Sequence, residues 1–330
     1  MATTLLAIES SCDDTSAAII REGKILSNIV SSQHQHVLLG GVVPEIASRA
    51  HVEMILPVVE KALSDSQVTI SDLDAIAITS SPGLLGSLHV GVTFAKSMAL
   101  ALDIPLIEVN HMDAHIMANL IGEDQPTFPF LCLTVSGGHT QISIVHSPLD
   151  IEIIGRTIDD AAGEAFDKSG KLLGLPYPAG PEIDRWAQLG KPVYTFPKPQ
   201  IVALDFSFSG LKTSFLYFLR DRLAEDPSFI EHKKADLCAS LQHTITDILM
   251  QKLEKAATET GIKNIALAGG VAANSALRSL LKEKGAEHNW EIFIPAMQYC
   301  TDNAAMIGIQ GYYKMHAGLY ADQTLEASPK

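Results

Sequence analysis

The sequence predicts an α/β protein made of two units that repeat the same order of strands and helices. The chain has 330 residues, roughly twice an average domain of about 150 residues. Hydrophobic residues make up 47% of it and charged residues 19%, a composition that suits a large buried core. Because the same element order occurs twice, we expect two duplicated α/β domains, residues 1–123 and 124–330.

The first unit is expected to start with strands around a polar turn. Its predicted strands are short apolar runs next to turn residues, namely 5–8, 17–20, 24–30, 75–78 and 106–109. Apolar residues at helical spacing over 45–63 and an Ala- and Leu-rich run over 86–102 predict two helices.

The second unit repeats this order after a turn-rich segment at 122–126. Its predicted strands are 130–135, 141–145, 151–154, 265–268 and 292–294. Helices are expected over 235–258, from residue 274, and at the end of the chain, where a last helix returns toward the first domain. Residues 174–210 contain six prolines, so we expect an irregular insertion there.

Charge is distributed unevenly along this acidic chain. The formal net charge is −14, of which −12 falls in residues 1–154 and only −2 in residues 155–330. On the scale of the whole chain this argues against nucleic acid, which normally leaves a basic footprint. The second half nevertheless retains candidates for a local basic patch, namely Arg185, Lys191, Lys198, Lys212, Arg220 and Arg222.

The four cysteines and the apolar runs indicate the compartment. The cysteines are far apart and form no Cys-x-x-Cys pair, which fits a reducing environment. The apolar run near the N-terminus lacks basic flanks and stops at Glu9, and charged Lys96 and Asp103 interrupt the best candidate for a membrane span. We therefore expect a soluble cytoplasmic protein that does not bind membranes.

A pair of histidines is the first candidate for chemistry. If the segment is helical, His111 and His115 lie one turn apart on one face, a spacing that allows two imidazoles to bind one metal ion. Asp302, at the start of the expected last helix, is the best candidate for a third ligand. The alternative is that both histidines simply face solvent or a cleft. A zincin protease would need Glu after the first histidine as its base, but Met112 stands there.

Two polar turns and a Gly-Gly turn are further candidates. Residues 10–15 and 136–140 each join two expected strands, and glycines in the second turn let backbone amides approach an anion. Gly269 and Gly270 lead from a strand into a helix, where a nucleotide can contact bare backbone. Each turn alone reads as an ordinary connection. The equivalent places of the two polar turns in a duplicated unit favour a functional role for both.

Several of these segments together resemble the TsaD family of tRNA N6-adenosine threonylcarbamoyltransferases, once called sialoglycoprotein endopeptidases. The resemblance runs from residue 5 to about residue 311 and is carried by residues 9–15, 40–51, the His111 and His115 pair, 135–140, 159–168, 205–212 and 269–274. It implies the fold of the actin-like ATPase superfamily (ASKHA, as in Hsp70), with two duplicated RNase H-like domains and an active cleft between them. The two-unit organisation expected from the element order agrees with that implication.

The resemblance also implies an activity. Members of the family transfer the threonylcarbamoyl group of threonylcarbamoyl-AMP to the exocyclic amine of the adenosine 3′ of the anticodon in tRNAs that read ANN codons, and release AMP. Implied partners are tRNA, a TsaB-like paralogue bound through the N-terminal domain, and a TsaE-like ATPase. A TsaC or Sua-type enzyme would supply the adenylate.

Matching positions carry the family's site residues over to this chain. The implied metal ligands are His111, His115 and Asp302, for one divalent ion, usually iron and sometimes zinc. The implied substrate-binding residues are Thr134, Val135, Ser136, Gly137, Gly138, His139, Asp167, Gly180, Asp184 and Asn274. As a mechanistic hypothesis, Asp13 positions the reacting amine or takes its proton.

Two other function classes compete with this transferase interpretation. One is a non-catalytic actin-like nucleotide-binding scaffold in the same complex, which would have no need to keep all three candidate metal ligands. The other is a metalloprotease, which the missing zincin glutamate makes the weaker alternative.

Overall fold

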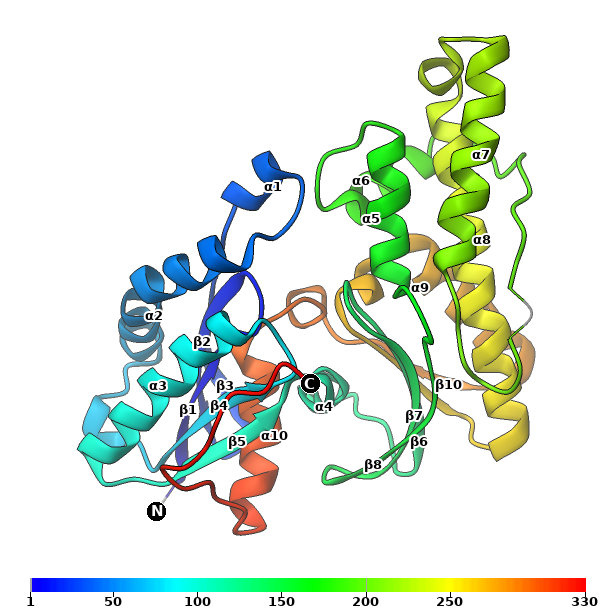
Figure 1. Ribbon diagram of the computed structural model, residues 1–330. Coiled ribbons are helices and arrows are strands. Elements are labelled where there is room, and N and C mark those ends of the chain that lie inside the picture. The colour runs from blue at the N-terminus through cyan, green and yellow to red at the C-terminus, as the bar shows by residue number, and fades with distance from the viewer. Residues whose placement is uncertain (1, 200) are drawn as a thin grey trace. The chain divides into compact units, whose positions relative to one another are not determined.

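The computed structural model describes residues 2–199 and 201–330, which fall into two compact units. Unit 1 comprises Met1–Gln125, Ser147–Asp150 and Pro295–Lys330, and unit 2 comprises Pro126–His146 and Ile151–Ile294. Each unit is built around one five-stranded sheet (Figure 1). Residues 1 and 200, the second of which belongs to the expected insertion, lie outside the described residues.

The sheet of unit 1 has the strand order β3-β2-β1-β4-β5. Its strands are β1 (Thr4–Glu9), β2 (Asp14–Arg21), β3 (Lys24–Ser32), β4 (Ala75–Ser81) and β5 (Leu106–Asn110). β2 runs antiparallel to β1, whereas β4 is parallel to both β1 and β5. The carboxyl ends of the three parallel strands therefore meet at one edge, where ligand sites of α/β sheets commonly lie.

Helices cover both faces of this sheet (Figure 1). They are α1 (Gln35–Leu39), α2 (Pro44–Ser66), α3 (Leu85–Leu102), α4 (His111–Met117) and α10 (Ala304–His316), with short 3-10 helices η1 (Ile70–Asp72), η2 (Ala118–Leu120) and η4 (Met297–Tyr299). α2 and α3 share one apolar cluster with the sheet, and α4 and α10 share the other. α10 lies so close to β2 that a Cβ on Gly308 would be 2.0 Å from the Ile20 side chain. The glycine at this position permits the close approach.

The sheet of unit 2 repeats that of unit 1. Its strands are β6 (Phe130–Val135), β7 (Thr140–Ser147), β8 (Asp150–Arg156), β9 (Asn264–Ala268) and β10 (Glu291–Phe293). The order β10-β9-β6-β7-β8 matches that of unit 1 read from its other edge. β7 is antiparallel to β6, whereas β9 is parallel to β6 and β10, so the duplication expected from the sequence is present.

The helices of unit 2 depart further from expectation than its strands. They are α5 (Ala162–Leu172), α6 (Ala179–Ala187), α7 (Ser209–Glu225), α8 (Phe229–Thr260) and α9 (Ser275–His288), with η3 (Gly270–Ala273). α6 lies within the proline-rich stretch, which is therefore not irregular throughout. α8 begins six residues earlier than expected, and α7 was not expected from the sequence.

The start of α7 depends on a carboxylate from elsewhere in the chain. Oδ1 of Asp159 accepts the amides of Phe208 (2.7 Å) and Ser209 (3.2 Å). Its Oδ2 accepts the hydroxyls of Ser207 (2.5 Å) and Ser209 (2.8 Å). Phe208, the residue at the N-cap, offers no capping side chain. Asp159 thus satisfies amides that a local Ser, Asp or Asn would normally cap.

We expect Asp159→Ala to lower the free energy of unfolding by about 1 kcal/mol, the usual cost of losing an N-cap. Burial opposes its charge, but the donors at Ser207, Phe208 and Ser209 hold the pKa of Asp159 below its usual value. This contribution is therefore fully present above the ordinary pKa of about 4 and lost as pH falls through the lower folded value. Denaturant unfolding at neutral and acid pH measures it. Exposed Asp221→Ala, on α7 itself, is the control, and equal losses would contradict the cap.

Helix α3 is the one described helix long and apolar enough to pass a composition test for a membrane span. Its buried face, which includes Leu88, Val92 and Ala95, belongs to the core of unit 1. The Lys96 ammonium donates to the carbonyl of Leu325 (2.9 Å). A core helix packed on a sheet commonly has the length and apolar composition of a membrane span. The cytoplasmic location stays a prediction.

Candidate functional site

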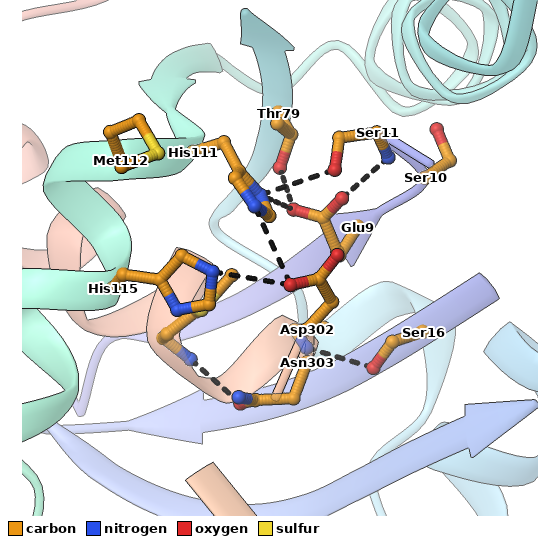
Figure 2. Close-up of polar contacts among 12 residues, drawn as sticks. Glu9, Ser10, Ser11, Ser16, Thr79, His111, Met112, His115, Asp302 and Asn303 are labelled. Atoms are coloured by element: carbon orange, nitrogen blue, oxygen red, sulfur yellow. Dashed lines mark hydrogen bonds and ion pairs between the residues drawn. The ribbon is translucent and has the colours of Figure 1, made fainter. Parts of the chain in front are cut away.

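Three candidate metal ligands meet in unit 1. The Asn110 side chain caps α4 by accepting the amides of Met112 and Asp113, so the helix starts at His111, directly after β5. His111 and His115 then lie on one face, with ring centroids 4.6 Å apart. Oδ1 of Asp302, just before α10, lies 3.5 Å from Nε2 of His111 and 3.1 Å from Nε2 of His115 (Figure 2).

The chemistry of this cluster fits a metal ion. The ligand atoms of His111, His115 and Asp302 all lie within 4.8 Å of one another. Two imidazole nitrogens and one carboxylate oxygen suit ions such as Fe²⁺ or Zn²⁺ and leave coordination positions open. Nδ1 of His115 is buried and has no hydrogen-bond partner among the described residues. The atoms that converge are Nε2 of both histidines and Oδ1 of Asp302, and this set of donors carries the fit to a metal ion.

Electrostatics keep the aspartate of this cluster ionised. Burial alone would raise the pKa of Asp302, but contact with His111 and His115 holds it well below its usual value. Burial lowers the pKa of His115, which keeps this imidazole neutral. Metal ligation needs an ionised carboxylate and neutral imidazoles, and Asp302 and His115 are in these forms. Burial lowers the pKa of His111, but Glu9 and Asp302 together raise it well above its usual value, so a metal ion must displace a proton from this ring.

The turn after β1 supports the cluster. Nδ1 of His111 lies 3.0 Å from Oε2 of Glu9 and 3.2 Å from Oγ of Ser11. The Ser11 carbonyl accepts the amide of Leu84 (2.7 Å), and a Cβ on Gly83 would lie 2.5 Å from the same oxygen. The loop after β4 is therefore in backbone contact with the turn, which fixes Ser11 relative to the cluster. A contact of Glu9 with the candidate metal ligands was not expected from the sequence.

The candidate catalytic residue Asp13 lies in the same turn, half-buried, just before β2. The adjacent carbonyl of Cys12 faces Nε2 of His51 (2.9 Å) and accepts the hydroxyl of Ser87 (3.0 Å), so helices α2 and α3 both hold the turn. Among the described residues, no hydrogen bond joins Asp13 to the metal ligands. Burial, reinforced by Asp13, raises the pKa of the Cys12 thiol, which disfavours a thiolate nucleophile.

The candidate phosphate-binding turn of unit 2 joins β6 to β7. The Ser136 amide donates to the His139 carbonyl (2.8 Å), and Oγ of Ser136 accepts the His139 amide (3.1 Å). Gly137 and Gly138 at the tip are exposed, so their backbone is accessible to a ligand. Thr134 and Val135, also predicted to bind substrate, are fully buried in β6 and offer no free side chain.

Two glycines from other elements pack against this turn. A Cβ on Gly163, in the first turn of α5, would lie 2.4 Å from the Ser136 carbonyl oxygen. A Cβ on Gly269, which follows β9, would lie 2.4 Å from the Val135 carbonyl oxygen. Gly269 also has φ +86°, a conformation that favours glycine. The turn is thus held between two backbone segments where only glycine fits.

Asp167 and Gly180 come together at the start of α6. Oδ1 of Asp167 accepts the Ala179 amide (2.7 Å), and the Gly180 amide also points to this carboxylate. Burial raises the pKa of Asp167, although these amides favour its charged form. The carboxylate therefore caps α6 and has acceptor capacity left for a ligand hydroxyl.

The carboxylate of Asp184, which lies on α6, and the side chain of Asn274 both contact the start of α9, where each already has partners. The Asp184 carboxylate accepts both the amide (3.0 Å) and the hydroxyl (2.7 Å) of Ser275. Oδ1 of Asn274 accepts the Leu277 amide (3.0 Å), and its Nδ2 donates to Oε1 of Gln242 (2.8 Å). Sequence reasoning missed Ser275 and the buried Gln242, because nothing local in the sequence marks partners that fold together from distant segments.

Comparison with known proteins identifies the family of this chain. A family model described as TsaD, tRNA N6-adenosine threonylcarbamoyltransferase, matches residues 24–309. A relative from Cytophaga hutchinsonii is 53% identical and covers 100% of this chain and 96% of its own length. One from Phocaeicola vulgatus is 58% identical, with 95% and 94% covered. Both are named tRNA N6-adenosine threonylcarbamoyltransferase. The chain belongs to the TsaD family.

This membership confirms the predicted family and its enzyme class, a transferase in tRNA modification. Solved structures confirm the predicted fold. The chain is similar to HypF from T. kodakarensis with a TM-score of 0.64 at 16% identity, covering 98% of this chain and 49% of that chain. It is also similar to a ROK hexokinase from Thermus thermophilus, with a TM-score of 0.53 at 16% identity over 96% and 100%. At these identities the likeness shows the actin-like ATPase fold alone.

Proposed function

We propose that this TsaD-family chain transfers the threonylcarbamoyl group of threonylcarbamoyl-AMP to the exocyclic amine of the adenosine 3′ of the anticodon in tRNAs that read ANN codons. The observation that carries the proposal is the meeting of His111, His115 and Asp302 within 4.8 Å in a member of this family. A non-catalytic scaffold has no need of such a buried ligand set, so the cluster favours the enzyme.

The residues of unit 2 would hold the adenylate. The exposed tip at Gly137 and Gly138 offers backbone amides for the phosphate and for the charge that develops on it as AMP leaves. Asp167, with acceptor capacity left at the start of α6, would bind a ribose hydroxyl. Because Asp184 and Asn274 already have protein partners, we propose that they act mainly by holding the start of α9, with Gly270 open toward the adenine.

The residues of unit 1 would act on the acyl group. His111, His115 and Asp302 would hold one divalent ion, iron or zinc, and when bound this ion supplies Lewis acidity toward the threonylcarbamoyl group. In the transfer, the adenosine amine forms a bond to the carbamoyl carbon, and the bond from that carbon to the phosphate oxygen breaks. The half-buried Asp13 would position the amine or accept its proton.

The proposed activity is tested by nucleoside analysis. Purified protein is incubated with a TsaB-like partner, a TsaE-like ATPase, tRNA and threonylcarbamoyl-AMP, and the digested tRNA is analysed by mass spectrometry. We expect threonylcarbamoyladenosine in reactions that contain this chain and none when it is left out. A complex that binds nucleotide and tRNA but forms no modified nucleoside would favour the scaffold instead.

The proposed partner surfaces lie on different units. For the TsaB-like partner we propose the groove between α2 and α3 in unit 1, which is lined by Val52, Ile55, Leu56, Val90 and Phe94. Val52 and Leu56 are exposed there, and an exposed apolar stretch of this kind is typical of protein–protein contacts. The TsaC or Sua-type enzyme would act upstream by supplying the adenylate.

For tRNA we propose the surface of unit 2 that carries Lys212. Four of the candidate cations are each paired with a carboxylate, whereas no ion pair of Lys212 occurs among the described residues; the paired cations are Arg185, Lys198, Arg220 and Arg222. We expect Lys212→Glu to weaken tRNA binding. The slope of the logarithm of affinity against the logarithm of salt concentration should become shallower by about 1, as expected for one lost phosphate contact. Titrations at several salt concentrations measure both. Lys61→Glu on unit 1, whose amine pairs with Asp65, is the control, and equal affinity for both variants would contradict this placement.

A further inference from the structure

Glu9 is a buried carboxylate whose contacts indicate a role at the metal ligands. It ends β1 and is 1% exposed, yet among the described residues it forms no ion pair with a lysine or arginine. Oε1 accepts the Ser11 amide (2.5 Å), and Oε2 accepts the Thr79 hydroxyl (2.6 Å) and faces Nδ1 of His111 (3.0 Å). An amide and a hydroxyl that both donate to one carboxyl group favour its ionised form.

The contact between Glu9 and His111 determines which ring nitrogen is left to bind a metal ion. A proton on Nδ1 donates to Glu9, which leaves Nε2 as the nitrogen that faces Oδ1 of Asp302, at 3.5 Å (Figure 2). In the metal-free chain a second proton on Nε2 can donate to this oxygen, and a metal ion would take the place of that proton. The carboxylate–imidazole contact therefore prepares Nε2 for a metal ion, as outer partners of metal-bound histidines do.

Charge balance points the same way. The cluster contains two carboxylates, Glu9 and Asp302, and two imidazoles within contact of one another. With a divalent ion bound at Nε2 of both rings, both imidazoles are neutral, and the two negative charges match the two positive charges of the ion. Without Glu9, the same ion would leave one positive charge unbalanced in a buried site, which is costly.

We propose that Glu9 is a positioning residue of the metal centre, which orients the His111 imidazole through Nδ1 and supplies the second of the two negative charges that balance a divalent ion. This inference rests on the proposed metal site. It predicts that Glu9 acts on metal affinity, a property that a residue needed only for folding would not change selectively.

Cobalt titration of the metal-free full-length chain tests this role. Glu9→Gln keeps the size of the side chain and an oxygen able to accept from His111, but it removes the charge. We expect its affinity for Co²⁺, followed by the absorption of the bound ion, to fall about 10- to 100-fold, the usual loss on removing an outer partner. The rise in melting temperature on adding Co²⁺ should shrink in parallel.

Glu108→Gln is the matched control. Glu108 lies on β5 and, like Glu9, accepts a side-chain hydroxyl, that of Ser80 (2.7 Å), but no hydrogen bond or ion pair joins it to the cluster within the described part of the chain. We expect Co²⁺ affinity equal to that of the original chain. Equal affinity in Glu9→Gln, or a lower melting temperature of its metal-free form with unchanged affinity, would overturn the role of Glu9 alone. Failure of the original chain to bind Co²⁺ would overturn the metal site itself, and the inference with it.

Discussion

Replacing His111 with alanine is expected to lower threonylcarbamoyl transfer by more than about 100-fold, because losing even an outer partner of a metal ligand costs up to that factor. His111 supplies one of the three ligand atoms that lie within 4.8 Å of one another. With it gone, His115 and Asp302 remain, and two protein ligands hold an ion weakly. The loss should appear in metal content and in the yield of modified nucleoside together.

A histidine outside the cluster separates this effect from a general loss of stability. His146 is exposed in unit 2 and pairs with Glu152 (3.3 Å), so His146→Ala should keep both metal content and transfer. Circular dichroism should show that both variants are folded. Full transfer by folded, metal-free His111→Ala would contradict the assignment of the ligand.

Gly269→Ala is expected to lower the free energy of unfolding by about 2–5 kcal/mol, with contributions from positive φ and from overpacking. The new Cβ would lie 2.4 Å from the Val135 carbonyl oxygen, and the nearest atoms are backbone, which cannot rotate away. Relief of the clash must shift β6 where it leads into Ser136. We therefore expect weaker adenylate binding as well as lower stability.

The neighbouring glycine offers a matched control. A Cβ added to Gly270 would meet no other described atom within 4 Å, and this residue has no positive φ, so Gly270→Ala should change stability little. Denaturant unfolding of both variants measures the loss of stability, and titration of Gly269→Ala and the original chain with a non-hydrolysable adenylate measures the loss of binding. Equal stability of the Gly269→Ala and Gly270→Ala variants would show that the close approach at Gly269 does not hold the turn.

The sheets could be predicted from the sequence because each strand is a short apolar run between turn residues. β1 and β6 are buried along their whole length, and both were expected within two residues of their ends. α7 could not be predicted in this way. The carboxylate that caps it belongs to Asp159, about fifty residues upstream, so no local signal marks where the helix begins.

The candidate site shows the same division between local and distant information. His111 and His115 are one helical turn apart, so their shared face could be predicted from spacing alone. Glu9 reaches His111 across 102 residues of sequence, and Gln242 reaches Asn274 across 32. Such contacts depend on strand order and helix packing, which residue spacing does not specify.

Metal-dependent transfer is the most direct test of the proposed enzyme. The chain is stripped of metal with a chelator, reconstituted with Fe²⁺ or Zn²⁺, and supplied with partners, tRNA and threonylcarbamoyl-AMP before mass spectrometry of the nucleosides. We expect the metal-free chain to form little threonylcarbamoyladenosine, and added metal to restore it in the original chain but not in His111→Ala. Equal product from the stripped and the reconstituted chain would contradict a metal centre at His111, His115 and Asp302.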